Sequence, residues 1–323
     1  DEAAQRAWKR TVVQDAIARI AGVKKPPVAD PAASPVGLGY RNKVEFALGA
    51  GPSGRPAAGL RAVGGAAVVD VERCLMQSEP AGRVWTAARA ILTDGDTFSA
   101  WWERREPLRI VVRSSSVDGR VVVALRCVGD LPREDRFADR LIAAAPDVSG
   151  VVRIEAIPGR RGGGRERTLA GEPRLTERWL GTTFRLPASA FFQVNPGAAE
   201  VLGDRVLAAS GPAAGRRVVD LFGGVGAYAW ALSRGGDRVT VVEASREAVR
   251  CGRKADGGAG VRAPRFVPAD VATWVRDPGA LHGVDLVIAN PPRTGFPKGV
   301  AEVVARGRAA RVVLVSCDPA TLA

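Results

Sequence analysis

The residues from Arg216 onward constrain the fold most, because short β-branched runs alternate there with stretches of helical spacing. Five runs read as strands, and helical or turn segments separate them. These runs are 217–222, 239–243, 266–267, 284–289 and 311–316. Alternation of this kind predicts an α/β fold with a doubly wound parallel sheet.

Chemically distinctive residues lie just past the carboxyl ends of these runs, which is the edge where open α/β sheets bind ligands. A loop with Gly224 and Gly226 follows the first run, Glu243 ends the second, and Asp270 follows the third. Glycine lets the backbone approach a ligand closely, and Glu243 is placed to accept hydrogen bonds from a ribose diol. Asp270 suits an adenine amino group. These residues fit NAD and S-adenosylmethionine equally well.

The fourth and fifth runs end in a rigid turn and a thiol. Asn290 precedes two prolines, which fix a turn whose carbonyls and side-chain amide suit a flat substrate. Cys317 is either a small space-filling side chain or a nucleophile. A dehydrogenase has no use for such a turn beside a thiol, so the pair favours methyl transfer to a base.

The first half of the chain has a different texture. Residues 3–21 predict a helix, and the proline-rich stretch 24–35 predicts a linker. Short strands and turns between 37 and 181, with a helix at 81–92, predict an α+β module dominated by antiparallel pairs. The helix at 3–21 carries an apolar stripe that we expect to pack into a core: Trp8, Val12, Ala16 and Ile20.

The net charge of +13, carried mostly by arginine, favours a polyanionic partner such as nucleic acid, although an arginine-rich proteome is the alternative. Within the α+β module, Arg104, Arg105 and the loop 160–167 are basic; the loop either closes on a phosphate backbone or is solvated. Trp101 and Trp102 either stack on bases or belong to a core. One histidine, four irregularly spaced cysteines and the lack of an apolar span or signal peptide predict a cytoplasmic protein without membrane contact.

Five stretches together resemble the RNA uracil-5-methyltransferases, which make 5-methyluridine in tRNA and 23S rRNA. They are 189–196 (SAFFQVNP), 220–226 (DLFGGVG), 242–243 (VE), 290–295 (NPPRTG) and 316–322 (SCDPATL). Weaker similarity, including Tyr40-Arg41-Asn42-Lys43, extends across the whole chain.

The resemblance implies a Rossmann-like class I methyltransferase sheet with a smaller α+β central domain. It implies S-adenosylmethionine-dependent methylation of uridine C5 in RNA, with rRNA favoured over tRNA, by a monomer in which Cys317 is the nucleophile. The residues implied at the cofactor are Gln193, Phe222, Gly224, Gly226, Glu243, Asp270 and Asn290. Those implied at the substrate are Phe191, Asn290 and Arg293.

The expected domains are 1–35, a helix and linker packing on the catalytic domain; 36–183, the RNA-binding module; and 184–323, the methyltransferase domain. The last domain is expected to be incomplete, with the family's glutamate base lying beyond Ala323. Asn290 and Ala227 replace residues that the family usually has as Asp and Asn. Cys74 matches the fourth ligand of a [4Fe-4S] cluster, which this chain is not expected to complete because the other three ligands lie upstream.

Cys127 and Cys251 are interpreted as structural. Two other functions stay open: an adenine-N6 methyltransferase, suggested by the Asn-Pro-Pro turn, and a catalytically silent RNA-binding protein, suggested by Asn290 and Ala227.

Overall fold

The computed structural model describes residues 1–65, 67–93, 99–102, 108–156, 164–212 and 215–323. The chain divides into two compact units. The first comprises Asp1–Pro35, Trp179–Phe184 and Gly197–Ala323, and the second comprises Val36–Arg178 and Arg185–Pro196. Arg104, Arg105 and residues 160–163, which the sequence marks as basic, lie outside the described residues.

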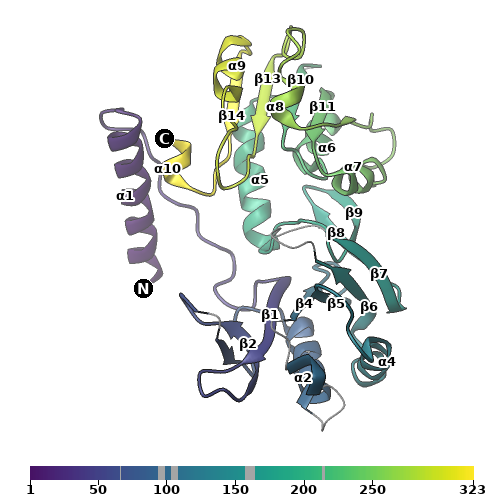
Figure 1. Cartoon of the computed structure of the whole chain (residues 1–323). Helices are drawn as coiled ribbons and strands as arrows, with labels where there is room; N and C mark the ends of the chain where they lie inside the picture. Colours follow the sequence, from purple (N-terminus) through teal and green to yellow (C-terminus); the bar gives the residue numbers. More distant parts are fainter. Residues whose placement is uncertain (66, 94–98, 103–107, 157–163, 213–214) are drawn as a thin grey trace. The chain divides into compact units, whose positions relative to one another are not determined.

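The first unit contains a five-stranded sheet in the order β12-β11-β10-β13-β14. Its strands are β10 (Arg217–Leu221), β11 (Arg238–Glu243), β12 (Arg265–Pro268), β13 (Leu286–Ala289) and β14 (Arg311–Leu314). All four neighbouring pairs are parallel, so the five carboxyl ends share one edge of the sheet (Figure 1). This is the parallel α/β sheet that the alternating pattern predicts.

Helices cover both faces of this sheet. They are α5 (Pro196–Ser210), α6 (Ala227–Arg234), α7 (Arg246–Arg253), α8 (Val271–Trp274), α9 (Val300–Arg306) and α10 (Pro319–Leu322). Val242 shares a core cluster with residues of α8 and α9. Side chains alternate along a strand, so Val241 points to the other face, where Gly226 at the start of α6 packs against it. The sheet is therefore doubly wound.

The helix predicted at the start of the chain is α1 (Glu2–Ile20), which lies beside α10 (Figure 1). The expectation that its apolar stripe is buried is wrong. Trp8 and Ile20 are 67% and 58% exposed, and none of the 19 residues of α1, all of them described, is buried. The four-residue α10 is too short to cover so long a helix.

The second unit contains a seven-stranded sheet in the order β3-β2-β1-β4-β5-β6-β7. Its strands are β1 (Lys43–Ala50), β2 (Pro56–Arg61), β3 (Val68–Asp70), β4 (Arg109–Ser114), β5 (Val121–Cys127), β6 (Val148–Glu155) and β7 (Arg165–Gly171). Its helices are α2 (Glu79–Thr93), α3 (Ser99–Trp102) and α4 (Glu134–Ala144). Only β5 and β6 pair in parallel among these described strands, so antiparallel pairs dominate as predicted. A separate hairpin of β8 (Arg174–Trp179) and β9 (Thr182–Pro187) supplies residues to both units.

Aromatic side chains fill the core of the second unit. Trp85 stacks on Phe46 with ring centroids 3.7 Å apart. Trp101 is buried, and its Nε1 donates a hydrogen bond to the carbonyl of Pro132 at 2.8 Å. Trp102 packs partly buried against the same core. The core interpretation of the two neighbouring tryptophans is therefore correct.

The basic loop expected at 160–167 ends earlier than the sequence suggests. Its last residues belong to strand β7, and Arg167 pairs with Glu134 of α4. Among the helices of the described residues, none is both long enough and apolar enough to cross a membrane.

Candidate active site

The loop after β10 is tightly wound and presents its backbone outward. Phe222, Gly224 and Gly226 all have left-handed backbone angles, with φ of 57°, 57° and 78°. The Gly226 amide donates to the Gly223 carbonyl at 2.8 Å, which closes the turn. A Cβ placed on Gly224 would meet no heavy atom within 4 Å, so this side of the loop faces open space. Such a loop lets a ligand approach the backbone closely.

Glu243 fixes this loop from the neighbouring strand. Its Oε2 accepts a hydrogen bond from the Gly224 amide at 3.0 Å, and its Oε1 accepts one from the Ser245 amide at 2.6 Å. A carboxylate has about four acceptor positions, so two stay available for hydroxyl groups. Asp270 follows β12 and caps α8, because its Oδ1 accepts from the Thr273 amide at 2.9 Å.

Asp220, inside β10, is a further acidic residue that the sequence reasoning did not assign to the site. It is fully buried, and neither carboxyl oxygen has a hydrogen-bond partner among the described residues. Burial, helped by the nearby charge of Glu243, raises the pKa of Asp220 to about 8. The buried hydroxyl of Tyr228 also has no partner there, and burial and Asp220 raise its pKa. An acidic residue within the apolar run Val218–Leu221 was the signal in the sequence.

Gly223 leaves the space that the Asp220 carboxyl occupies. A Cβ on Gly223 would lie 2.7 Å from Asp220 Oδ2 and 2.7 Å from Val241 Cγ1, both too close for a real side chain. The loop backbone therefore rests directly on a carboxyl group that has nothing else to bind. Buried groups of this kind call for an explanation, and a ligand is a common one.

Asn290 and Cys317 extend the same edge. The Asn290 amide donates to the Leu221 carbonyl at 3.3 Å, which sets Asn290 beside the glycine loop. The Val315 amide donates to the Ala289 carbonyl at 2.8 Å, so the chain leading to Cys317 runs beside the chain leading to Asn290. Asn290 is half-buried and Cys317 is exposed. The thiol is therefore accessible, which favours the nucleophile over the space-filling interpretation.

The turns that carry Asn290 and Cys317 are tied together. Arg293 Nε lies 3.6 Å from Asp318 Oδ2, and the Thr321 hydroxyl donates to the Arg293 carbonyl at 3.4 Å. Asp318 also caps α10, since its Oδ1 accepts from the Ala320 amide at 2.9 Å. One carboxylate thus orients both the helix after Cys317 and the arginine after Asn290.

The motif at 189–196 belongs to the second unit. Asn42 holds this motif with two hydrogen bonds. Its side-chain Nδ2 donates to the Gln193 carbonyl at 3.2 Å, and its backbone amide donates to the Val194 carbonyl at 3.0 Å. Phe191 is 78% exposed, while Gln193 is half-buried. The structure thus joins two stretches that carry the resemblance. A role for Gln193 or Phe191 at the cofactor or substrate stays a prediction.

Of the remaining cysteines, Cys74 and Cys127 belong to the second unit and Cys251 to the first. Cys74 packs partly buried against the core of the second unit, while Cys127 and Cys251 are buried. The part of the chain that the structure describes holds no group of three side chains able to bind a metal ion. Participation of Cys74 in an iron–sulfur cluster stays a prediction.

A parallel sheet with a glycine loop and carboxylates along its carboxyl edge is a Rossmann-like arrangement, and its match to a solved methyltransferase gives the class: a Rossmann-like class I methyltransferase fold. The crystal structure of Pyrococcus abyssi tRNA (uracil-54, C5)-methyltransferase in complex with S-adenosyl-L-homocysteine has the same fold. It matches with a TM-score of 0.74 and 22% identity, covering 98% of this chain and 75% of that one.

Curated relatives identify the family. A protein from Nitratidesulfovibrio vulgaris, named an uncharacterized RNA methyltransferase, is 31% identical over 338 residues, covering 99% of this chain and 71% of the relative. Another so named, from Thermosynechococcus vestitus, is 30% identical over 324 residues, covering 99% of this chain and 72% of the relative. No protein-family model matches the chain. The chain belongs to the same family of RNA methyltransferases, which confirms the resemblance drawn from the motifs.

Proposed function

We propose that the chain methylates C5 of uridine in RNA, with S-adenosylmethionine as methyl donor and Cys317 as nucleophile, and that rRNA is its substrate rather than tRNA. One observation carries this proposal. The five strands, taken in their order in the sheet, end at Asp270, Glu243, the glycine loop, Asn290 and Cys317. Cofactor-type and substrate-type residues thus follow one another along a single edge.

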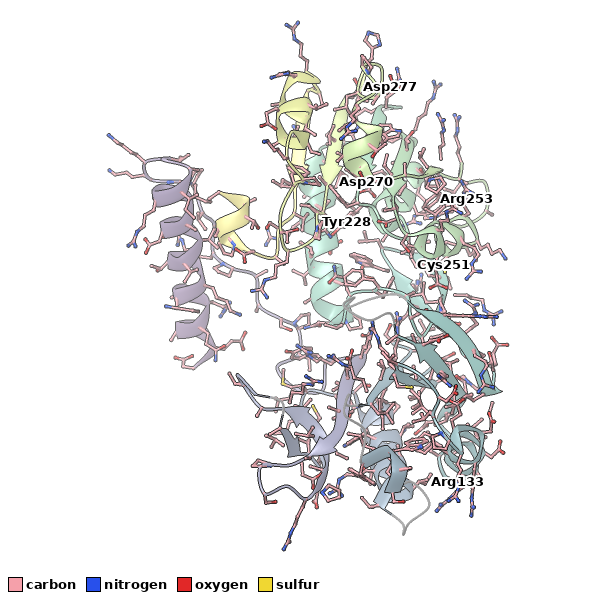
Figure 2. All side chains as sticks on the ribbon, viewed as in Figure 1. Arg133, Tyr228, Cys251, Arg253, Asp270 and Asp277 are labelled. Carbon is pink, nitrogen blue, oxygen red and sulfur yellow. The ribbon has the colours of Figure 1, made fainter. Side chains whose placement is uncertain are left out.

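The residues of this edge fit the proposed donor. S-adenosylmethionine carries a positive sulfonium and a positive ammonium group, and the carboxylates of Glu243 and Asp270 make two adjacent strand ends acidic. The unpartnered Asp220 carboxyl under Gly223 is consistent with a cationic ligand at this loop. Figure 2 shows Asp270 and Tyr228 in the first unit, Asp270 at the start of α8.

We assign the ribose hydroxyls to Glu243 and the adenine amino group to Asp270, with Phe222, Gly224 and Gly226 forming the loop around the donor. Asn290 and Gln193 complete this set by family resemblance. When bound, S-adenosylmethionine supplies an electrophilic methyl group.

The thiol of Cys317 explains how uridine becomes reactive. Uracil C5 is a poor nucleophile, but addition of a thiolate to C6 turns the ring into an enolate whose C5 is nucleophilic. After C5 has accepted the methyl group, a base removes the C5 proton, and the Cys317–C6 bond breaks to release the thiolate. The uridine must leave its stack to reach Cys317. Arg293 and Phe191, both exposed, are proposed to hold the RNA.

RNA containing 5-fluorouridine tests the covalent step, because fluorine at C5 cannot leave as a cation and the adduct persists. The whole protein is expected to form a stable protein–RNA species in the presence of S-adenosylmethionine. Cys317→Ala should form none and should lose methylation, while Cys127→Ala, which removes a buried thiol of the second unit, should keep both. Methylation that survives Cys317→Ala contradicts the mechanism.

Mass spectrometry of nucleosides from treated rRNA and tRNA tests the product. We expect 5-methyluridine in rRNA. N6-methyladenosine would instead support the adenine methyltransferase. The absence of any methylated nucleoside, together with no donor binding in calorimetry, would support the silent RNA-binding protein.

A further inference from the structure

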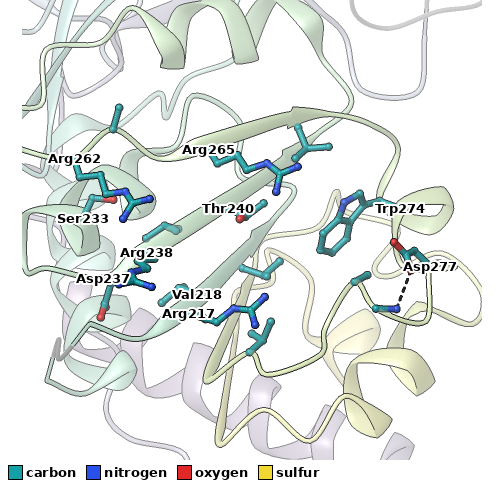
Figure 3. Close-up of a pocket in the computed structure, with 17 residues that line it drawn as sticks. Arg217, Val218, Ser233, Asp237, Arg238, Thr240, Arg262, Arg265, Trp274 and Asp277 are labelled. Carbon is teal, nitrogen blue, oxygen red and sulfur yellow. Dashed lines mark hydrogen bonds between the residues drawn. The ribbon is translucent and has the colours of Figure 1, made fainter.

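The amino-terminal edge of the same parallel sheet holds a cavity of about 390 Å³ (Figure 3). It lies wholly within the first unit, at the ends of the strands opposite to Cys317 and the glycine loop. The first residues of three adjacent strands line it: Arg217, Arg238 and Arg265. Arg262, which precedes β12, is a fourth lining arginine.

The strand register brings these arginines together. Arg217 pairs with Arg238, and Thr240 pairs with Arg265. Since residues two apart on a strand share a face, the three strand-initial arginines start from one face of the sheet. In Figure 3 the side chains of Arg217 and Arg265 extend toward the space in front of Trp274. Like charges on neighbouring strands repel, so packing alone does not favour this arrangement.

These arginines take part in no ion pair among the described residues. Within the described part of the chain, no carboxylate forms an ion pair with any of these four guanidinium groups. The two lining carboxylates have other partners. Asp237 pairs with Arg216 at 2.7 Å, and Asp277 Oδ1 accepts a hydrogen bond from the Gly279 amide at 2.8 Å. The four arginines are therefore available to an anionic ligand.

The composition of the cavity indicates the kind of anion. A guanidinium fork matches the oxygens of a phosphate, and a partly exposed tryptophan ring offers a surface on which a base stacks. Trp274 is such a ring, half-buried against the sheet. Val219, Val267 and Val284 add apolar wall, and the volume lies within the range of small-ligand pockets.

We propose that this cavity binds one nucleotide of a single-stranded RNA segment, with its phosphate on the arginines and its base against Trp274. It is a second RNA contact, separate from the edge that carries Cys317. The inference rests on RNA being the partner, as the proposed function requires. It does not depend on which base is methylated.

Fluorescence anisotropy with a fluorescein-labelled pentauridylate tests the arginines. The whole protein, without methyl donor, is titrated between 50 and 200 mM salt. Arg217→Gln combined with Arg265→Gln should weaken binding about tenfold or more, and should reduce the slope of log K against log salt by about 0.7, as expected for one lost phosphate contact on a single strand. Arg205→Gln combined with Arg306→Gln, two exposed arginines outside the cavity, is the matched control.

Equal affinity and equal slope in the two double variants would overturn the proposal, as would failure of the unaltered protein to bind pentauridylate. Thermal unfolding of each variant checks that the fold is kept. Competition tests the stacking: uridine 5′-monophosphate should displace the probe at lower concentration than inorganic phosphate. Equal competition would show an anion site without a base contact and would contradict the assigned role of Trp274.

Crosslinking tests the same nucleotide site in the unaltered protein, without any substitution. Pentauridylate with one 4-thiouridine should crosslink to the segment containing Trp274, and crosslinks confined to other segments would contradict the proposal. None of these measurements requires methyl transfer. A protein that binds as described but forms no 5-methyluridine would overturn the proposed function alone, and the reverse outcome would overturn this inference alone.

Discussion

The two edges of the parallel sheet carry opposite charge. On two adjacent strands an arginine begins the strand and a carboxylate ends or follows it: Arg238 and Glu243 on β11, Arg265 and Asp270 on β12. On β10, Arg217 begins the strand, and the Asp220 carboxyl inside it keeps its proton at neutral pH in the absence of a ligand. Because parallel strands align like ends, the sheet separates the two charges along its strands. In Figure 2, Asp277, which lines the arginine cavity, lies at the top of the view, and Asp270 lies below it.

In the mostly antiparallel sheet of the second unit, opposite charges lie next to each other on neighbouring strands. There, Arg109 of β4 pairs with Glu45 of β1, so opposite charges from neighbouring strands neutralise each other. A parallel sheet can thus offer one edge to a cationic ligand and the other to a polyanion, which is the division that we propose.

The largest expected effect concerns the buried carboxyl of the acidic edge. Because the pKa of Asp220 is about 8 when folded and 3.8 as the reference value, the folded state keeps a proton that the unfolded chain releases. Its contribution to the free energy of unfolding is therefore full below pH 4 and falls as pH rises toward 8, by up to about 1.4 kcal/mol per pH unit. Asp220→Asn should remove this slope.

Urea unfolding between pH 5 and 8, without methyl donor, measures the slope. Asp277→Asn at the basic edge is the control and should keep the slope of the unaltered protein. If Asp220→Asn keeps it as well, Asp220 does not titrate as described.

Glu243 should affect only the acidic edge. Glu243→Ala removes a charged acceptor from two backbone amides and from the proposed ribose contact, so the Kd for S-adenosylmethionine should rise about 10- to 100-fold. Calorimetry measures this. Binding of pentauridylate at the basic edge should not change, and Glu302→Ala on the exposed side of α9 should change neither. A loss of both ligands would contradict the separation of the edges.

Gly223 tests how closely the loop rests on Asp220. Gly223→Ala would place a Cβ 2.7 Å from the carboxyl and from Val241, and we expect a loss of about 1–3 kcal/mol in the free energy of unfolding. Gly82→Ala in α2 is a control of opposite sign, since a Cβ there meets nothing within 4 Å and alanine favours a helix by about 0.5–1 kcal/mol. Equal urea midpoints of unfolding for Gly223→Ala and the unaltered protein would show that the loop adjusts to the added Cβ without a loss of stability.

The smallest stability effect is expected at Arg293. Its pairing with Asp318 is long and its side chain is 82% exposed, so Arg293→Ala should change the free energy of unfolding by less than about 1 kcal/mol. kcat/KM for RNA should nevertheless fall, whereas Arg306→Ala should leave it unchanged. If Arg293→Ala keeps the kcat/KM of the unaltered protein for RNA, Arg293 is not one of the residues that contact RNA.

The sequence predicts the parallel sheet well because buried strands need continuous β-branched runs, and polar residues mark where each strand ends. That pattern predicts that Glu243, the glycine loop, Asn290 and Cys317 lie at one edge, but not their order along it. Helix α5 was not predicted. Its Gly203 packs against Leu180, where a Cβ would lie 2.5 Å from a side-chain carbon, so a residue that reads as a helix breaker is a packing requirement.

Other features depend on information that a periodic pattern does not contain. The stripe on α1 identifies an apolar face but not whether anything covers it, which is why Trp8 was wrongly expected to be buried. The arginine cavity depends on which strands are neighbours and in which register. In the sequence, Arg217 begins the first predicted run, and Arg238 and Arg265 directly precede the second and third. Only the strand order shows that these arginines form a cluster.

The winding of the loop after β10 has a consequence for ligand entropy. Phe222 is held in a left-handed conformation that costs a residue with a side chain about 1–2 kcal/mol, and the Glu243 and Gly223 hydrogen bonds fix the residues that follow. The loop is therefore ordered before any ligand arrives. Binding then costs conformational entropy in the ligand and not in this loop. A more rigid ligand of the same shape should therefore bind with a lower Kd.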